Sequence, residues 1–406
     1  MTINTKQTEN DWNEVKLNDV VSFIIDNRGK NPPRYTDYGI PVIDNFQITG
    51  KRSVSIDESK RFIDEEIFQT FIRKYIQKND VLITLVGNGY GNVALAPQDK
   101  SVIIQNTIGI RCGDECLNEF LFYFLILNKR LVENLDRGAA QPSVKVSDLM
   151  KIEFSLPQLK IQKNIVMLLS TYDNLIEINE KRIKVLEEMA RLLYREWFVE
   201  FRFPGYEKVK MIDSSTEYGI IPEGWVVTKF GHLFDVKYGK NLSIEKISSS
   251  GKYKVYGAGG VIGYYDQKNI NDKTSLVTCR GNGSGTVWRT FGEGFITNNS
   301  FTITGKDNEI AFEFVYSCLQ NSNISSTISG SAQPQITVGS INFVKLILPP
   351  KDLIKLYIIK TKSLYVLADE LRRINKNLSE TRDLLLPKLM SGEIDVNNLD
   401  IKVVEN

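Results

Sequence analysis

The chain has 406 residues, of which 42% are hydrophobic and 25% are charged, a composition typical of a globular protein with room for two cores of ordinary size. Its formal net charge of +2 neither requires nor excludes nucleic acid as a partner. No apolar run approaches membrane-spanning length, and residues 1–11 are polar and contain no apolar signal region. We therefore expect a cytoplasmic protein.

Cysteine and histidine are too few for the commonest metal and nucleophile chemistries. The four cysteines are scattered and predict no disulfide framework: Cys112, Cys116, Cys279 and Cys318. Cys112 and Cys116 lie close in sequence, but no second pair of ligands completes a zinc site around them. The single histidine, His232, is more simply explained as a packed or surface imidazole than as a catalytic base. We predict no metal, cofactor or catalytic group on this chain.

The chain carries the same sequence features twice, in the same order. They are a tryptophan (Trp12 and Trp225), a glycine-rich turn (Gly87–Gly91 and Gly281–Gly285) and an Ala-Gln-Pro segment (138–142 and 330–334). The separation between the copies falls from 213 residues at the tryptophans to 194 at the turns and 192 at the Ala-Gln-Pro segments. We therefore expect the length differences to lie near the start of each copy. A duplicated chain suits a target that is itself in two parts.

In chain order, the pattern predicts two globular domains that alternate with two helical segments. Residues 12–158 show short alternating apolar runs separated by Gly, Asn and Pro, which predicts strands and turns with one helix near residues 119–134. Residues 204–350 repeat that pattern. The helical spacers are expected at residues 159–203 and 351–394, and the flexible ends at residues 1–11 and 395–406.

Each helical segment carries an apolar seam. In the first segment the seam follows steps of three and four residues: Ile161, Ile165, Leu168, Tyr172, Ile176, Asn179, Ile183, Leu186, Ala190, Leu193 and Trp197. In the second the seam residues are Leu353, Tyr357, Leu364, Ala368, Leu371, Leu378, Leu385 and Leu389. The seams predict a long antiparallel two-helix coiled coil, about 55 Å long, with the globular domains at its opposite ends. The alternative is that each helix packs only on its own domain.

The expected fold class is therefore α+β, with two β-rich mixed domains related by a pseudo-twofold internal repeat. Each seam also contains an asparagine, Asn179 in the first helix and Asn375 in the second. A buried polar residue at a seam position costs stability but penalises wrong registers. We predict that these two residues set the register of the helices.

The motifs of several enzyme classes are incomplete or missing. Asn31-Pro-Pro-Arg34 is close to the Asn-Pro-Pro-aromatic tetrapeptide of amino-group DNA methyltransferases, but Arg34 replaces the aromatic ring that stacks on the flipped base. The glycine-rich turns lack the spacing of a dinucleotide fingerprint, and the sequence has no phosphate loop of the Gly-x4-Gly-Lys-Ser/Thr type. The simplest interpretation of these glycines is a tight turn between strands, which can also let the backbone approach DNA closely.

Four stretches of the second half form a specific set. They are Tyr-Gly-Ala-Gly-Gly-Val-Ile-Gly-Tyr at residues 256–264, Arg-Gly-Asn-Gly-Ser-Gly at 280–285, Gly-Ser-Ala-Gln-Pro-Gln at 330–335 and Leu-Pro-Lys-Leu-Met-Ser-Gly-Glu-Ile at 386–394. Together with their counterparts in the first half they resemble the specificity subunit of type I restriction-modification enzymes, over residues 12–394. The resemblance implies two target recognition domains that each read one half of a split DNA site. Because the first copy has no such glycine-rich stretch, we expect an asymmetric site.

The resemblance also implies that the chain itself is not catalytic. In that family the helices space the recognition domains and dock two methyltransferase subunits. Methylation with S-adenosylmethionine and cleavage with ATP and Mg²⁺ would belong to methyltransferase and restriction/translocase partner subunits. Double-stranded DNA is the expected ligand, and no membrane is involved. Two alternatives remain from the residues alone, a coiled-coil scaffold with protein-binding ends and a stand-alone DNA methyltransferase.

The candidate DNA contacts are polar and basic residues beside the turns. In the first copy they are Arg28, Lys30, Arg34, Asn88, Tyr90 and Gln141. In the second copy they are Lys240, Asn241, Arg280, Asn282, Ser284 and Gln333.

Overall fold

The computed structural model describes residues 12–29, 31–87, 89–136, 142–330 and 333–397. Contacts divide the chain into two compact units: unit 1 is Met1–Glu177 with Lys376–Asn406, and unit 2 is Ile178–Asn375. The predicted flexible segment 1–11 and residues 398–406 of the predicted tail lie outside the described residues. Each long helix is shared between the units, whereas the sequence pattern set the helices apart as spacers.

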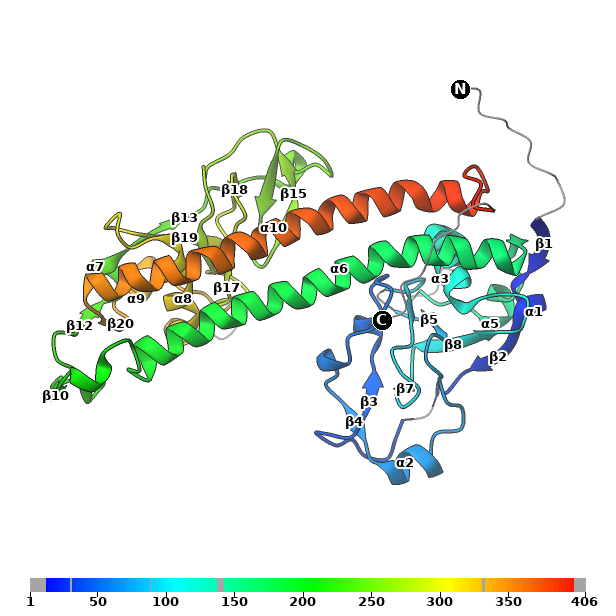
Figure 1. Cartoon of the computed structure of the whole chain (residues 1–406), viewed down its shortest axis with the longest axis horizontal. Coiled ribbons are helices and arrows are strands. Elements are labelled where there is room, and N and C mark those ends of the chain that lie inside the picture. Colours follow the sequence, from blue (N-terminus) through cyan, green and yellow to red (C-terminus); the bar gives the residue numbers. More distant parts are fainter. Residues whose placement is uncertain (1–11, 30, 88, 137–141, 331–332, 398–406) are drawn as a thin grey trace. The chain divides into compact units, whose positions relative to one another are not determined.

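Unit 1 contains a mixed helix-and-sheet domain built from three sheets (Figure 1). Its four-stranded antiparallel sheet has the order β2 (Val21–Ile25), β8 (Thr107–Cys112), β5 (Val81–Thr84) and β6 (Val93–Leu95). Its three-stranded sheet has the order β4 (Phe62–Ile63), β3 (Ile40–Ile43) and β7 (Val102–Ile103), and its two-stranded sheet joins β1 (Trp12–Lys16) and β9 (Glu153–Pro157). The helices between them are α1 (Leu17–Val20), η1 (Asn45–Gln47), η2 (Ile56–Glu58), α2 (Glu65–Thr70), α3 (Asn118–Leu127), α4 (Lys129–Glu133) and α5 (Val146–Leu149).

Unit 2 contains the corresponding sheets. The four-stranded sheet has the order β13 (Phe234–Tyr238), β19 (Ser300–Gly305), β16 (Ser275–Thr278) and β17 (Val287–Arg289). The smaller sheets are β15 (Val261–Tyr265), β14 (Tyr253–Tyr256) and β18 (Gly294–Ile296), and β12 (Val226–Lys229) with β20 (Lys345–Leu348). A hairpin of β10 (Met211–Asp213) and β11 (Ile220–Pro222) precedes them. The helices are η4 (Tyr206–Lys208), α7 (Phe230–Leu233), η5 (Ile244–Lys246), α8 (Phe312–Asn321), η6 (Ile324–Thr327) and α9 (Val338–Asn342).

The two domains have the same strand order in all three of these sheets. The pairings also agree in direction, since β3 and β7 run parallel in unit 1 as β14 and β18 do in unit 2, while the four-stranded sheets are antiparallel throughout. The internal repeat inferred from the sequence is therefore a repeat of the fold.

The length difference between the copies does not lie at their starts, as the spacing of the repeated motifs suggested. β1, β2 and β3 begin 214, 213 and 213 residues before their counterparts β12, β13 and β14. The segment between β3 and β5 spans residues 44–80 in unit 1, but its counterpart spans only residues 257–274 in unit 2. Trp12 and Gly87 lie on opposite sides of this segment, so their spacing alone could not locate the insertion.

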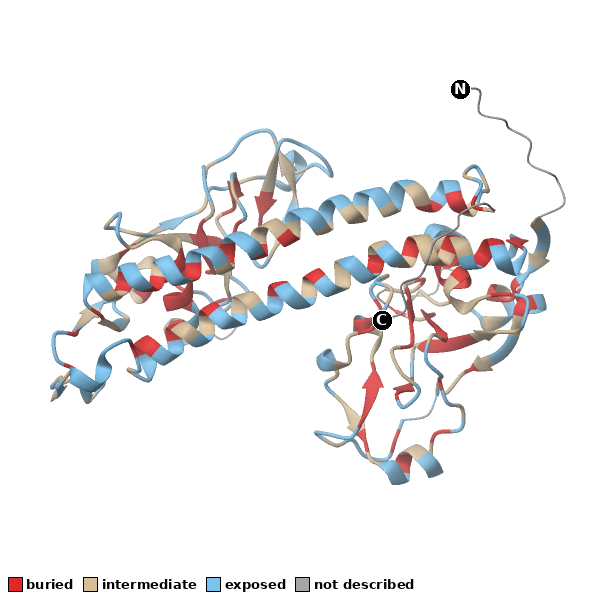
Figure 2. Cartoon of the chain, viewed as in Figure 1, coloured by how far each residue is buried: buried red, intermediate tan, exposed pale blue. Residues whose placement is uncertain are grey.

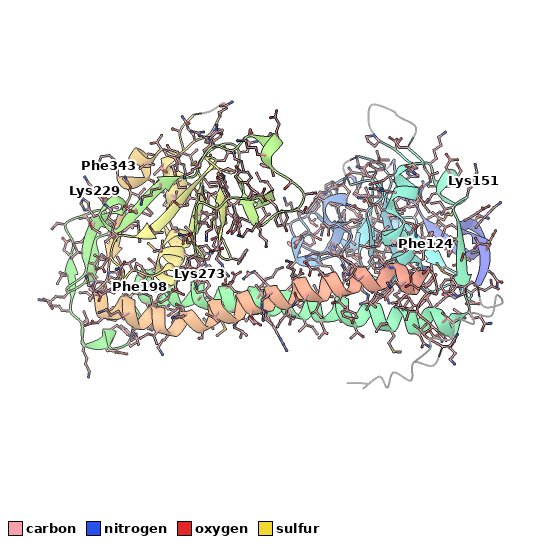
Figure 3. All side chains as sticks on the ribbon, turned by 90° about the horizontal axis from the view of Figure 1, so that it is seen from above. Phe124, Lys151, Phe198, Lys229, Lys273 and Phe343 are labelled. Atoms are coloured by element: carbon pink, nitrogen blue, oxygen red, sulfur yellow. The ribbon has the colours of Figure 1, made fainter. Side chains whose placement is uncertain are left out.

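Helices α3 and α8 connect each domain to the long helices. Residues 120–125 of α3 are apolar on every side of the helix and all are buried, as expected of a core helix. Phe124 of α3, which Figure 3 labels, stacks on Phe154 of β9. The two ring centroids are 4.6 Å apart. In unit 2, Phe314 of α8 meets Phe198, which follows the first long helix, edge to face at 5.5 Å.

The long helices are α6 (Leu159–Tyr194), which continues into a π-helical turn at Arg195–Val199, and α10 (Lys351–Met390). Buried and exposed positions alternate along both helices (Figure 2). Every residue of the two predicted seams is buried or half-buried, so the seam positions are confirmed. No described helix combines the length and the apolar character needed to cross a membrane.

Inside each unit, residues of α6 share buried clusters with residues of α10. In unit 1 the cluster contains Ile165 and Leu169 of α6 with Leu386 and Leu389 of α10. In unit 2, Ile183 of α6 clusters with Ala368 and Leu371 of α10. Within each unit the two helices therefore contact each other as well as the globular domain.

The two seam asparagines, both in unit 2, meet directly. Asn179 Nδ2 donates to Asn375 Oδ1 at 2.8 Å, and Asn179 is only 7% exposed. The bond satisfies a buried amide that would otherwise destabilise the helix pair. That the pair sets the helix register stays a prediction.

Candidate nucleic-acid interface

The glycine-rich turn and the Ala-Gln-Pro segment, which recur together in the sequence, are bonded to each other in both units. In unit 1, Gly87 N donates to Pro142 O at 3.1 Å. In unit 2, Gly281 N donates to Pro334 O at 2.9 Å. The second residue after each proline also pairs alike, because Val144 N donates to Leu85 O and Ile336 N donates to Cys279 O, each at 2.9 Å. The repeated motifs therefore build one loop framework.

The turn needs glycine because its backbone enters the left-handed region at its first and last glycines, and in unit 1 also at Gly89, where φ is +87°. Gly281 has φ +86° and Gly285 has φ +89°, and their counterparts Gly87 and Gly91 have φ +81° and +78°. A side chain is strained at such angles. Gly285 N then donates to Thr278 O at 2.9 Å, and Gly91 N donates to Thr84 O at 2.8 Å, so both turns close in the same way. The interpretation of these glycines as a tight turn between strands is confirmed.

In unit 2 the framework brings the predicted DNA contacts together. Arg280 is exposed, forms a backbone bridge with Gln335 and lies 5.9 Å from the ring centre of Tyr238. Tyr238 ends β13 and is 44% exposed. The exposed side chains on this surface, which we name the unit 2 turn surface, are Tyr238, Lys240, Asn241, Arg280, Asn282 and Gln333.

Lys240 and Arg280 border the same loop, residues 297–299. Lys240 forms a backbone bridge with Thr297, and Cys279, beside Arg280, donates its N–H to Asn299 O at 2.8 Å. Two cationic residues therefore border one loop, and neither forms an ion pair with another of the described residues. Free cations of this kind are suited to DNA phosphates, and Arg280 also to base edges.

Ser284, by contrast, is a structural residue of the turn. It is 9% exposed, and its hydroxyl lies 2.8 Å from both Gly281 O and Pro334 O. The hydroxyl can donate its one proton to either carbonyl oxygen, so its hydrogen bonding is directed into the turn and toward the Ala-Gln-Pro segment. It does not point outward. Ser284 therefore leaves the set of candidate DNA contacts.

The candidates of unit 1 are engaged differently. Arg28 is held by Asp26 through two side-chain bonds of 2.9 and 2.7 Å, and the Arg28 hydrogen bond keeps the pKa of Asp26 below its usual value. Arg34 bonds to Asp64 at 2.8 Å and Glu66 at 3.0 Å. Tyr90 is half-buried against the core of unit 1. Lys30, Asn88 and Gln141 lie outside the described residues.

Sequence reasoning missed a set of cations stacked on aromatic rings in unit 1. Arg61 lies 4.7 Å from the ring centre of Tyr35, and Lys74 and Arg111 lie 5.3 and 5.7 Å from that of Phe23. Each pair joins residues far apart in sequence, so no local spacing could predict it. Phe23, 42% exposed on β2, was the available signal, because it is a large aromatic residue on the outer face of a strand.

The described residues contain no group of three or more His, Cys, Asp or Glu side chains arranged to hold a metal ion. All four cysteines are free thiols. A hydrogen bond with Cys116 and burial raise the pKa of the Cys112 thiol, so the thiol stays protonated.

The comparisons with known proteins agree on one family. The model of the family described as "Type I restriction modification DNA specificity domain" matches residues 9–188 and 222–360. The chain belongs to this family. Its function is DNA sequence specificity in a type I restriction-modification system, and the resemblance inferred from the motifs is confirmed. The family is the specificity component and not the catalytic one.

Individual relatives are distant but span the whole chain. The MjaIX specificity subunit of Methanocaldococcus jannaschii is 24% identical, covering 96% of this chain and 95% of the relative. The MjaVIII specificity subunit of the same organism is 22% identical, covering 96% and 94%. The crystal structure of a type I S subunit from M. genitalium matches with a TM-score of 0.59 at 19% identity, covering 96% of this chain and 99% of that one. The fold is therefore shared with a solved S subunit.

Proposed function

We propose that the chain reads a bipartite, asymmetric DNA sequence, with the recognition domain of each unit binding one half. The observation that carries the proposal is that the two units share one loop framework but present different side chains on it. Before the glycine-rich turn, unit 1 has half-buried Val86 where unit 2 has exposed Arg280. Three residues after the end of β2, unit 1 has Arg28 where unit 2 has Asn241. Different side chains on the same backbone present different hydrogen-bonding groups to base edges.

The unit 2 turn surface has the chemistry for base recognition. An arginine can donate two hydrogen bonds to the O6 and N7 atoms of guanine, and an asparagine or glutamine can bind the N6 and N7 atoms of adenine. Arg280, Asn282 and Gln333 supply these groups on exposed loops that the framework bonds hold in place. Lys240 supplies a cation for the phosphate backbone.

We further propose that α6 and α10 pair as an antiparallel coiled coil that holds the two domains at opposite ends and so sets the distance between the half-sites. The support comes from unit 2, where positions rise along α6 as they fall along α10. Asn179 bonds to Asn375, Ile183 clusters with Leu371, and Ala190 O accepts a hydrogen bond from the Tyr357 hydroxyl. This order is that of an antiparallel pair.

The outer faces of the helices are proposed to dock two methyltransferase subunits. On the unit 2 part of α6, Ile178, Val185 and Met189 are about half exposed. On α10, Ile359 and Val366 are more than half exposed. Apolar side chains that recur on one helix face suit the apolar face of a partner helix. Methylation with S-adenosylmethionine, and cleavage with ATP and Mg²⁺ by restriction/translocase subunits, would take place on those partners.

The two alternatives lack comparable support. A scaffold protein would need the same exposed apolar faces, but the family match favours a DNA reader. A stand-alone methyltransferase would need a base pocket at residues 31–34, where Arg34 is instead held at the surface by Asp64 and Glu66 with its side chain 58% exposed.

Methylation mapping in the cell that carries this gene tests the proposal. Modified bases should fall at one two-part sequence, and deletion of the gene should abolish modification at every such site. The purified chain alone should bind DNA without methylating or cleaving it. Persistence of the modification after deletion, or turnover by the chain free of other subunits, would contradict the proposal.

A further inference from the structure

Three equivalent positions in the two units lie where α3 or α8 meets the long helices. Tyr123 and Ser317 are each the sixth residue of α3 and α8. Asp173 and Tyr365 are each the fifteenth residue of α6 and α10, while Arg382 and Ala190 are each the thirty-second residue of α10 and α6. The same three sites in the repeat are therefore filled by Tyr, Asp and Arg in unit 1 and by Ser, Tyr and Ala in unit 2.

In unit 1 the site is built around a buried carboxylate. Tyr123 is 2% exposed, and its hydroxyl donates to Asp173 Oδ2 at 2.6 Å (Figure 1 shows α3 beside α6). Arg382 of α10 pairs with the other oxygen of Asp173, which is 8% exposed as a residue. Burial and the Asp173 charge raise the pKa of Tyr123, so its phenol stays a donor. The carboxylate is thus bonded from both the domain and the second helix.

In unit 2 the residues at the three equivalent positions carry no charge, and the nearby Arg289 guanidinium lies 5.4 Å from the ring centre of Tyr365. Ser317 is fully buried, and its hydroxyl lies 2.9 Å from the Tyr365 hydroxyl. The Tyr357 hydroxyl lies 2.7 Å from Ser317 Oγ and 3.0 Å from Ala190 O. Burial raises the pKa of Tyr365 as well, so these hydroxyls form a neutral network.

Size and charge at the two sites are complementary only in the native combinations. Unit 1 places the large ring on the domain and the small group on the helix, and unit 2 does the reverse. The domain of unit 1 set on the helix segment of unit 2 would bring Tyr123 against Tyr365, which overpacks a filled core. The domain of unit 2 set on the helix segment of unit 1 would leave a void beside Ser317 and remove one hydrogen bond from Asp173.

An ion-pair cluster in unit 2 distinguishes the domains in the same way. Arg289, the last residue of β17, is 4% exposed and pairs with Glu187 of α6 and Asp369 of α10. Its counterpart, the last residue of β6, is Leu95, which is buried in the apolar core of unit 1. A buried arginine placed on the other helix segment would lose the carboxylate at the Glu187 position, where the repeat has Ser379.

We infer that the residues at these positions allow each recognition domain to pack well only on its own helix segment. We call this set of positions the key. A chain with two copies of one fold can dock a domain on the wrong segment, in the same molecule or in a second copy, and such misassembly is typical of repeated domains. The key penalises the wrong docking without changing the fold. The inference does not depend on what the domains bind, so it can fail while the proposed function stands.

Substitutions in the full chain test the key by exchanging the large and small side chains of unit 2 between the domain and the helix. Ser317→Tyr alone should lower the melting temperature of unit 2 by about 4–8 °C, because it overpacks a filled site. Adding Tyr365→Asp and Ala190→Arg recreates the combination found in unit 1 and should restore at least half of that loss. Tyr365→Phe is the control, since it removes one hydroxyl and keeps the ring volume.

The rescue separates a key from ordinary core packing. If the three substitutions give losses that add, or if Ser317→Tyr leaves the melting temperature unchanged, the inference is wrong. Where Ser317→Tyr yields no folded chain, the recovery of folded, soluble protein in the triple variant is the readout. Recovery supports the key, and a triple variant that also fails to fold contradicts it.

Discussion

Unit 1 and unit 2 share their strand order and the hydrogen bonds of their turns but differ in side chains beside them, such as Val86 where unit 2 has Arg280 and Arg28 where unit 2 has Asn241. Unit 1 inserts η2 and α2 between β3 and β5, whereas unit 2 adds the hairpin of β10 and β11 before its sheets. The framework bonds from Gly87 and Gly281 to the following prolines are the same. The comparison teaches that the repeated motifs hold the loops in place and that the residues between them are free to differ.

One pair of equivalent positions makes the difference concrete. Asp26 binds Arg28 in unit 1, but the counterpart of Asp26 is Gly239. A Cβ atom on Gly239 would lie 2.1 Å from Thr297 O, so no side chain fits there. The counterpart of Arg28, Asn241, is therefore exposed without a carboxylate two residues before it. A close backbone approach at Gly239 thus leaves no carboxylate to bind the side chain two residues later in unit 2.

The largest expected effect is on the ion pairs that unit 2 has and unit 1 lacks. Arg289→Met removes a buried charge from two carboxylates and should lower the free energy of unfolding of unit 2 by about 3 kcal/mol, measured by urea denaturation. Arg373→Met, which breaks the exposed pair with Glu370, is the matched control and should change nothing measurable. Equal effects of the two substitutions would mean that burial does not strengthen the Arg289 cluster.

The second prediction concerns the exposed arginine that only unit 2 presents. Arg280→Ala should weaken binding to the native DNA sequence by about 2 kcal/mol, or roughly 30-fold, if Arg280 contacts a guanine. On DNA in which the base pair contacted by Arg280 is changed, the variant and the unmodified chain should bind equally well. A base-pair change in the other half-site should weaken binding of both proteins by the same factor. A uniform loss across all DNA sequences would instead assign Arg280 to the phosphate backbone.

The third prediction concerns the polar pair between the long helices in unit 2. Under the 192-residue offset of the helices, the pair Asn179 and Asn375 corresponds to the apolar pair Leu371 and Ile183. Changing both asparagines to Leu should stabilise the chain by about 1 kcal/mol, since two buried amides are removed together. The permitted distance between half-sites should become less strict, as read from the methylated sequences. Lower stability with an unchanged spacing would refute the register role.

The smallest effect is the pH dependence of the Asp26–Arg28 pair, which unit 2 lacks because Gly239 stands at the position of Asp26. The hydrogen bond from Arg28 lowers the pKa of Asp26 from its usual 3.8, so the unfolded chain binds a proton at Asp26 more readily than the folded chain. The pair therefore stabilises the folded chain fully above pH 3.8 and less as the pH falls through the lower folded value. The stability advantage over Asp26→Asn should stay constant well above pH 3.8 and shrink as the pH falls below it. An advantage that grows on acidification would reverse the assigned direction.

The sequence predicted the duplication, the long helices and the turns, because these depend on local spacing. It could not predict the key. The seam passes through Tyr172, yet the fully buried neighbour is Asp173, which a search for apolar residues overlooks. The seam predicted for the second helix likewise omitted Thr361 and Tyr365, which are both buried on α10. Whether Arg28 and Arg34 are free or paired depends on residues that the fold brings near, and no spacing shows that.

The central claim is that each unit reads its own half of the DNA site, and an exchange of one recognition domain tests it most directly. Residues 206–350 are replaced by the corresponding domain of another specificity subunit, keeping both helix segments and the native partner subunits. Methylation mapping should then show a new second half-site beside an unchanged first half-site. A change in both halves together would contradict the account, because the two units would then not read the DNA independently.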